Sequence, residues 1–551
     1  MKKLAFLFLL FSASCEEDDS YVHPLDFFPE DTLVVAEISG EPWERLGEAT
    51  YANEFLSLPS WQKFYHPLYQ ELVTLDKKEL GGFGGMLVDH LSDARAWIGI
   101  PPDIAFDQRI YLGVQFATED SRAVVLDLLS GATTQEIAGH TAFLLPGFGV
   151  FVLENNNLLG VIRGVGDSEV GVDELASDFS QMVNRLSGTT SGFKSLPSYQ
   201  KMREVVGGDD TLFAMWFPGE SWSLETLAKM TNEEPPEEIA QIAKDLGLHN
   251  LDGFCYSMSL DGSWVDEKFY LLGTDLWEDL IPQKMLSEQD LIGYLETLPD
   301  DTLNTQIRLF DFGALVQMMK DLYATINELS ENRFNTEEVW NGLELAHELA
   351  KQAGPMFGQI LRAEDLWSNT VGDIWIDLKD EKAFREGWNK IPDEVRELLA
   401  YGITLPNSIQ HLGVELSPGR LVFTRTQAEE AEGSLGEQAG FDEVRARFEA
   451  LATDGIPFEI VFVGPEIFAN GLEALRKLDM EAWGEDPEEL PVNLNDLPTF
   501  DEVSNLFPTT VGLGVRRQDG LLTKYQSPLG VFVNGLGGLS TMGGLQSNEE
   551  F

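Results

Sequence analysis

Cysteine is nearly absent from this sequence: only Cys15 and Cys255 occur among 551 residues. If Cys15 is modified, no disulfide can form within the chain, so disulfides cannot hold the fold together. Cys255 lies in an apolar stretch, residues 253–256, which is typical of a buried structural thiol. A hydrophobic core must stabilise the chain instead, and an apolar content of 43% is ordinary for a globular protein.

Basic residues are scarce as well. The chain has 37 Lys and Arg against 93 Asp and Glu, which gives a formal net charge of −56. Nucleic acids and anionic headgroups are bound largely through Lys and Arg that neutralise phosphate, so this charge excludes DNA and RNA as partners. We expect a solvated acidic surface that serves solubility, with weak calcium binding by carboxylate clusters as the alternative.

Histidine is too thinly spread for a zinc site, because the seven histidines show no close pairing. His347-Glu348 begins like a zinc-protease motif, but Lys351 stands where the second histidine is needed. The sequence also has no phosphate-binding loop, nucleophile elbow or complete EF-hand loop. We therefore expect no metal and no cofactor.

Two Ser-x-x-Lys strings, Ser60 to Lys63 and Ser198 to Lys201, match the nucleophile motif of penicillin-recognising enzymes. The Ser-Asp-Asn and Lys-Thr-Gly elements of those enzymes are missing. Each serine follows Leu-Pro and is predicted to cap the helix that comes next. The strings are therefore interpreted as structural, no catalytic residue is predicted, and the chain is expected not to be an enzyme.

The N-terminal apolar run covers only residues 4–11, after Lys2 and Lys3 and before the small residues 12–14 and Cys15. Eight apolar residues cannot span a bilayer, which takes about 20 in a helix. Cationic, apolar and small residues in this order are typical of a secretory leader. The segment is similar to a bacterial lipoprotein signal peptide, in which the cysteine after the small residues receives lipid.

That similarity implies a signal peptide at 1–14, lipidation of Cys15 and an acidic tether at 15–26. Removal of Lys2 and Lys3 changes the net charge from −56 to −58. A lipoprotein carries more than one acyl chain, which is enough for stable anchoring. We expect a cell-envelope protein that is lipid-anchored at the periplasmic face or the outer membrane, and ordinary secretion is the alternative.

Signals for turns, strands and helices recur in one order in the two halves of the chain. Residues 29–33 and 299–303 are turns that lead into strands, and Asp261-Gly262 and Asp519-Gly520 are hairpin turns that close each half. Corresponding landmarks are 245 to 270 residues apart, the extremes being Gly219 with Gly464 and Asp31 with Asp301. This repetition predicts an internal duplication.

The predicted fold is α+β, with two tandem related domains at 27–290 and 291–545 and a flexible tail at 546–551. Each domain is expected to combine a mainly antiparallel sheet with amphipathic helices, because hairpins join many of the strands. A length of 551 residues also exceeds what one hydrophobic core usually organises.

The leader, the turn-and-strand openings of both halves and the recurring strand–acid–helix units together resemble a family of large exported bacterial lipoproteins. This family is of planctomycete and myxobacterial type and is known only as a domain of unknown function. The resemblance implies no catalytic residues. It favours a non-enzymatic binding or structural module of the envelope, with a membrane, an envelope protein or a glycan as partner.

Two other functions stay open. One is a hydrolase of envelope polymers whose acidic residues gather between the domains. The other is a carrier of an apolar ligand, for which the candidate lining residues are Trp61, Trp216, Trp264 and Phe217. Strand aromatics of this kind usually face the interior, so we expect these four to belong to the core.

Overall fold

A computed structural model shows the fold of the chain. It describes residues 23–39, 45–79, 94–101, 109–116, 118–145, 149–163, 172–186, 191–208, 210–219, 251–273, 280–281, 286–329, 337–362, 373–390, 412–417, 419–425, 433–476 and 493–530. Cys15, the predicted signal peptide at 1–14 and the predicted tail at 546–551 lie outside these residues.

The described residues form one antiparallel sheet of 18 strands. The first ten are β1 (Val34–Ile38), β2 (Arg95–Ile100), β3 (Arg109–Gln115), β4 (Thr133–Ile137), β5 (His140–Leu145), β6 (Gly149–Glu154), β7 (Asn157–Arg163), β8 (Thr211–Pro218), β9 (Gly253–Asp261) and β10 (Trp264–Leu272). The others are β11 (Thr302–Leu309), β12 (Ala353–Arg362), β13 (Asp373–Leu378), β14 (Leu412–Ser417), β15 (Arg420–Arg425), β16 (Ile456–Val463), β17 (Thr510–Arg516) and β18 (Gly520–Ser527).

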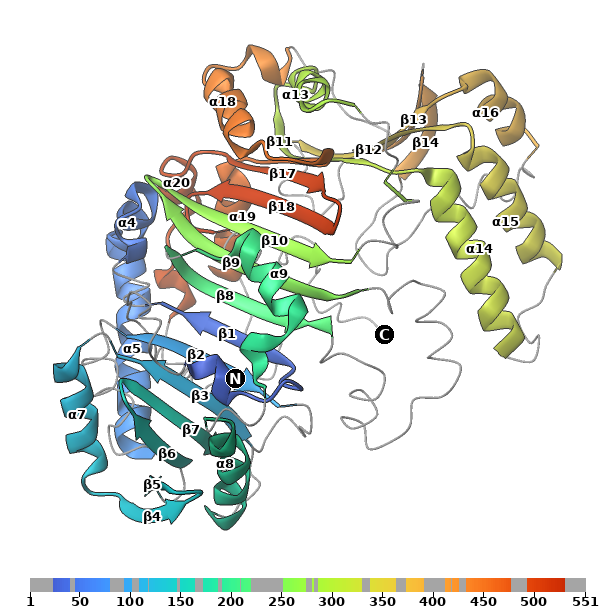
Figure 1. Ribbon diagram of the computed structural model, residues 1–551. Helices are drawn as coiled ribbons and strands as arrows, with labels where there is room; N and C mark the ends of the chain where they lie inside the picture. The colour runs from blue at the N-terminus through green and yellow to red at the C-terminus, as the bar shows by residue number, and fades with distance from the viewer. Residues whose placement is uncertain are drawn as a thin grey trace, which may run out of the picture.

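Strand pairing gives the order β4-β5-β6-β7-β3-β2-β1-β8-β9-β10 for the N-terminal strands. The C-terminal strands follow as β18-β17-β16-β11-β12-β13-β15-β14, joined to the others by the pairing of β10 with β18. The sheet runs from β4 at the bottom of Figure 1 to β13 and β14 at the upper right. The predicted α+β class and antiparallel pairing are confirmed, whereas the division into two domains stays a prediction.

Helices cover both faces of the sheet. One face, called the first face, packs on α2 (Pro24–Phe27), α8 (Val172–Leu186), α9 (Pro197–Val206), α13 (Glu288–Glu296) and α18 (Phe441–Leu451). The second face packs on α4 (Thr50–Leu56), α5 (Pro59–Glu79), α7 (Glu119–Leu129), α15 (Glu337–Ala350), α16 (Glu381–Trp388), α19 (Pro465–Arg476) and α20 (Phe500–Ser504). Because side chains alternate along a strand, Trp216 reaches the first face, whereas Phe213, three residues earlier on β8, reaches the second.

Several helix boundaries follow from capping. Thr118 accepts a hydrogen bond from the Ser121 backbone N–H at the start of α7 (3.2 Å), and Asp380 does the same for Ala383 in α16 (2.9 Å). Acidic residues fill the first turn of both helices, as the sequence predicted. The caps predicted at Ser60 and Ser198 are both wrong. Helices α5 and α9 already begin at Pro59 and Pro197, and the fixed φ of proline suits a first helical position.

The folded part of the chain begins within the expected tether. His23, Pro24 and Leu25 are buried, and His23 Nδ1 accepts a hydrogen bond from the Leu25 backbone N–H (3.1 Å) at the start of α2. Phe27 contacts Phe179 of α8, with ring centroids 6.0 Å apart. Residues 23–26, assigned to the tether from the sequence, therefore belong to the core.

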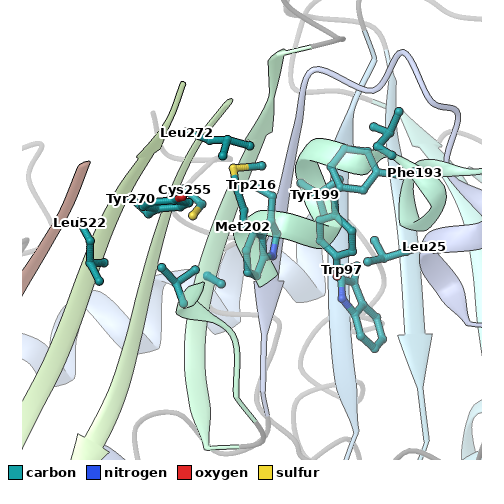
Figure 2. Packing of buried hydrophobic residues seen from close by; sticks show 14 of the residues in the cluster. Leu25, Trp97, Phe193, Tyr199, Met202, Trp216, Cys255, Tyr270, Leu272 and Leu522 are labelled. Atoms are coloured by element: carbon teal, nitrogen blue, oxygen red, sulfur yellow. The ribbon is translucent and has the colours of Figure 1, made fainter. Parts of the chain in front are cut away.

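The main apolar core lies on the first face and is continuous across both predicted domains. In Figure 2, Tyr199 of α9 lies between Phe193 and Trp216, whose ring centroids are each 5.2 Å from its own. Tyr270 and Leu522, from β10 and β18, extend the same cluster toward the C-terminal strands. Cys255 is fully buried in it and burial raises the pKa of its thiol, so the predicted structural role is confirmed.

A buried ion pair lies beside this core. Glu37 of β1 accepts a hydrogen bond from the Trp216 indole N–H (3.2 Å), and its other oxygen lies 3.5 Å from the Arg95 guanidinium of β2. Both charged side chains are almost completely buried. A buried charge that loses its partner is much costlier than an exposed one.

We therefore expect Glu37→Gln to lower the free energy of unfolding by about 3 kcal/mol, because it leaves the Arg95 charge buried without its carboxylate. Urea unfolding followed by circular dichroism measures this difference. The control is Glu204→Gln on the exposed side of α9, with an expected change within about 0.5 kcal/mol. Equal effects of the two variants would show that the Glu37–Arg95 pair does not stabilise the fold.

Candidate binding site at the junction of β10 and β18

The pairing of β10 with β18 brings the N-terminal and C-terminal strands into one sheet. The ladder runs from Val265 opposite Ser527 to Leu272 opposite Gly520. Each of the two strands is the second strand of an Asp-Gly hairpin, with β9 and β17 as first strands. The junction therefore places side chains from distant parts of the sequence directly opposite each other.

Two lysines face each other in this ladder. Lys268 of β10 is the direct partner of Lys524 of β18, and both side chains are half-buried. Burial lowers the pKa of Lys524, and the charge of Lys268 lowers it further. Like charges directly opposite each other destabilise a pair of strands. Among the described contacts neither ammonium forms an ion pair, so the repulsion is not cancelled by a salt bridge there.

A carboxylate lies beside the lysines: Asp266 is two residues before Lys268 on β10 and diagonal to Lys524 of β18. Asp266 accepts a hydrogen bond from the Gln526 side-chain amide (3.3 Å). Burial raises the pKa of Asp266 and the charge of Asp261 raises it too, whereas Gln526, Lys268 and Lys524 lower it. Asp266 thus supplies one negative charge against the two positive charges of the lysines.

Arg447 of α18 borders the site. Its guanidinium donates to the Gln526 side-chain oxygen (2.9 Å), the Gln526 carbonyl (2.7 Å) and the Thr509 carbonyl (2.5 Å). It also lies over the Trp264 ring, 3.5 Å from the centroid. Burial lowers the pKa of Arg447 to about 10. These contacts connect α18 to the end of β18.

The C-terminal end of α9 lies on the other side of the lysines. Ser257, the β9 partner of Lys268, donates to the carbonyl of Val206, the last residue of α9 (3.0 Å). A helix C-terminus carries a partial negative charge that favours a nearby cation. It offsets part of the repulsion between the lysines without neutralising either of them.

The acidic residues of β10 do not form a catalytic pair. Asp266 lies on the first face, whereas the next residue, Glu267, reaches the second face, where it accepts hydrogen bonds from Tyr256 Oη (2.5 Å) and Ser527 Oγ (3.3 Å). Glu267 is fully buried, and burial together with this carboxylate raises the pKa of Tyr256. The described residues also contain no cluster of three or more metal-ligating side chains.

The aromatic residues considered as a ligand lining do not converge. Trp216 lies in the core of the first face and donates to Glu37, and Trp61 contacts Phe55 in a cluster on the second face (4.8 Å between centroids). Trp264 lies beneath Arg447, and Phe217 contacts Phe254 on the second face (5.4 Å). Only Trp216 is fully buried in the core as expected; Trp61 is partly buried against a core cluster, and Trp264 and Phe217 are partly exposed.

The serine and lysine of each Ser-x-x-Lys string differ in partner or in burial. Ser60 Oγ donates to Glu502 of α20 (3.2 Å), and Lys63 pairs with Asp496 (2.5 Å). Ser198 is buried, whereas Lys201 is exposed. Glu348 of α15 pairs with Lys351 (2.6 Å).

Sequence reasoning missed the lysine pair, although a signal for it exists. Lys268-Phe269 and Lys524-Tyr525 each follow an Asp-Gly hairpin turn by a few residues. Only the pairing of β10 with β18 shows that these lysines face each other. Two half-buried ammonium groups whose Cβ atoms are about 5 Å apart can donate hydrogen bonds to the oxygens of one anionic group.

The fold and this site define an α+β protein built on one antiparallel sheet with a cationic spot at its centre. A scan against protein-family models finds no match, and no curated protein matches the sequence significantly. Two crystal forms of the treponemal protein TP0453 are similar in structure, at 12% and 11% identity over 51% of this chain and 89% and 90% of theirs. The TM-score is 0.24 for both, a value too low to carry an argument.

Among the described residues, no helix combines the length and apolar character needed to cross a bilayer. The resemblance to exported lipoproteins, the lipid on Cys15 and the envelope location all stay predictions.

We expect Lys524→Met to raise the free energy of unfolding at pH 7 by about 0.2–1 kcal/mol, because it removes a like-charge pair. The pKa of Lys524 is lower in the folded chain than in the unfolded one, so the cost of its charge is present below the lowered pKa. This cost disappears as the pH rises above the pKa of about 10.4 that Lys524 has in the unfolded chain, because the side chain is then neutral in the folded and the unfolded chain. Denaturant unfolding at several pH values measures the difference. The exposed Lys201→Met is the control, and a gain of equal size there would contradict the explanation.

Proposed function

We propose that this protein is an exported, lipid-anchored module of the cell envelope that binds a partner and does not catalyse a reaction. The observation that carries the proposal is the opposed pair Lys268 and Lys524, half-buried at the centre of the sheet in a chain of net charge −56. We propose that the pair binds a phosphate or carboxylate group of an envelope glycan or protein.

The electrostatics support an anionic ligand. Bringing an anion between the lysines relieves their repulsion, so the same charges that destabilise the free site stabilise the complex. Arg447 and the α9 terminus fix the two borders of the site, which reduces the ordering cost of binding. The large negative net charge of the chain repels polyanions, so a single anionic group is favoured over a nucleic acid or an anionic bilayer.

The order of the strands supports the predicted duplication. In both parts of the sheet the strands occur in corresponding order, β6-β7-β3-β2-β1-β8-β9-β10 in one and β14-β15-β13-β12-β11-β16-β17-β18 in the other. We propose that the two predicted domains arose from one unit and meet at β10 and β18. The lysines would then occupy equivalent positions beside an approximate two-fold axis.

Anion binding is measured by calorimetry with inorganic phosphate and with a carboxylated oligosaccharide. We expect the double variant Lys268→Met/Lys524→Met to weaken binding by about tenfold or more, since each charged hydrogen bond contributes about 1.5–3 kcal/mol. The control Lys201→Met/Lys382→Met changes the net charge equally at two exposed positions. Equal losses in both variants, or no binding by the native chain, would contradict the anion site.

The hydrolase alternative is tested with the same protein. Incubation with peptidoglycan and envelope polysaccharides should release no product above background. Turnover that one Asp or Glu substitution abolishes would replace the binding function with a catalytic one.

The anchor is tested on the chain expressed in a bacterial host. We expect mass spectrometry to find a mature N-terminus at Cys15 carrying a diacylglycerol thioether and an additional acyl chain. Cys15→Ser should shift the protein from the membrane fraction to the soluble exported fraction. A native chain that keeps Met1, or whose mature N-terminus is another residue without lipid, would contradict the anchor.

A further inference from the structure

The opposed lysines of β10 and β18 lie between an apolar and a polar part of the first face. Along the ladder, the next pair on this face toward one end is Tyr270 with Leu522, and both belong to the main apolar core (Figure 2). The next pair toward the other end is Asp266 with Gln526. The half-buried ammonium groups are therefore bordered by core side chains on one side and by polar groups on the other, and both keep access to solvent.

The two lysines differ in their other neighbours. The β17 partner of Lys524 is Leu513, a buried core residue, whereas the β9 partner of Lys268 is Ser257, which is polar. Burial lowers the pKa of Lys524, and the charge of Lys268 lowers it further. An amine that is desolvated and lies next to a second cation acts as a nucleophile at a pH where an ordinary lysine is protonated.

We propose that Lys524 is a nucleophilic amine that forms a Schiff base with the carbonyl group of an α-keto acid, while Lys268 binds the carboxylate of the same molecule. In this class of molecules the carboxylate is bonded directly to the carbonyl carbon. Two lysines whose Cβ atoms are about 5 Å apart can therefore reach both groups of one small ligand. The part of Lys268 rests on the anion site proposed above, whereas the reaction of Lys524 does not.

The reaction needs no oxidant, reductant or further reactant. The Lys524 nitrogen adds to the carbonyl carbon, the carbonyl oxygen leaves as water, and a carbon–nitrogen double bond replaces the carbon–oxygen one. One ammonium group and one ketone thus give one iminium cation and one water, so that atoms and charge balance. Hydrolysis of the iminium returns the amine and the ketone unchanged, so the ligand is captured covalently and is not turned over.

One proton has to move during this exchange. The ammonium group of Lys524 must lose a proton before its nitrogen can attack, and the departing oxygen must gain protons to leave as water. Asp266, diagonal to Lys524, can accept the first proton and return it to the oxygen. The Gln526 side chain accepts from Arg447 (2.9 Å) and donates to Asp266 (3.3 Å), which positions this carboxylate beside the lysines.

Charged groups on the neighbouring elements set the protonation of Lys524. They are Lys268 and Asp266 of β10, Asp261 in the β9–β10 turn, Arg517 after β17 and Arg447 of α18, together with the carbonyl end of α9. Lys268 and Arg517 lower the pKa of Lys524, and Asp266 raises it. Loss of the Lys268 charge should therefore raise the pKa of Lys524.

Reductive trapping tests the amine. The purified protein is incubated with pyruvate and cyanoborohydride, which converts the iminium into a stable secondary amine, and the modified lysines are identified by peptide mass spectrometry. At pH 7 we expect the adduct at Lys524 to form about tenfold or more faster than at the exposed Lys201, since the fraction of neutral amine limits the rate. Lys524→Met should leave the adduct at Lys201 unchanged. Modification of Lys201 without faster modification of Lys524 would overturn the proposal.

The part of Lys268 is tested by comparing pyruvate with acetone, in which a methyl group replaces the carboxylate. We expect the preference for pyruvate at Lys524 to exceed the preference at Lys201 by about fivefold or more, because a charged hydrogen bond to the carboxylate contributes at least this much. In Lys268→Met the two preferences should become equal, and half-maximal labelling of Lys524 should move to higher pH. A variant in which neither the preference nor the pH profile changes would remove Lys268 from the site.

The role of Asp266 has a test of its own. Asp266→Asn removes a negative charge, which by itself lowers the pKa of Lys524 and would speed labelling. If Asp266 carries the proton, labelling should instead slow by about tenfold or more. The control is Asp261→Asn, an exposed position with the same change of charge, and it should not slow the reaction. Faster labelling of Asp266→Asn would show that this carboxylate transfers no proton.

Phosphate binding separates this proposal from the anion site, because phosphate has no carbonyl group. A protein that binds phosphate but gives no adduct at Lys524 keeps the anion site and loses the Schiff base. A protein that binds no phosphate, and whose Lys524 reacts with pyruvate and acetone without preference, keeps the nucleophilic amine and loses the anion site. Circular dichroism of each variant establishes that a lost adduct is not a lost fold.

Discussion

The backbone hydrogen bonds between β10 and β18 are the interaction on which the rest of the structure depends. They convert two groups of strands into one sheet and bring Tyr270 and Leu522 into a common core. An unpaired strand edge would expose a row of N–H and C=O groups. The ladder removes two such edges at once, and the surrounding contacts of Arg447 and Glu267 hold it from opposite faces.

Local parts of the fold could be predicted because short-range physics determines them. The Asp-Gly turn signals gave the β9–β10 and β17–β18 hairpins, and acidic residues marked the starts of α7 and α16. The pairing of β10 with β18 could not be predicted, since it joins segments about 260 residues apart and depends on which edges remain open. The role of Ser198 was misread because Pro197 already starts the helix.

The candidate site was harder to find than the fold for a related reason. A lysine on a strand is ordinary in sequence, and Lys268 and Lys524 become unusual only when the ladder makes them neighbours. Ser60 and His347 were considered as catalytic or metal-binding residues from the sequence, and both lie on helices. Ser60 donates a hydrogen bond to Glu502, and Lys351 stands one turn after His347 where a zinc site would need a second histidine. Alternation along β10 likewise separates Asp266 from Glu267, which no motif search takes into account.

The position of β18 near the end of the described chain has a consequence for biogenesis. While the polypeptide is being synthesised, β9 and β10 emerge about 250 residues before the strand that pairs with β10. The nascent N-terminal part therefore waits with an open sheet edge, and contacts of such long sequence separation form slowly. A chain of this design gains from remaining unfolded, or from being shielded by a chaperone, until residues 520–527 have emerged.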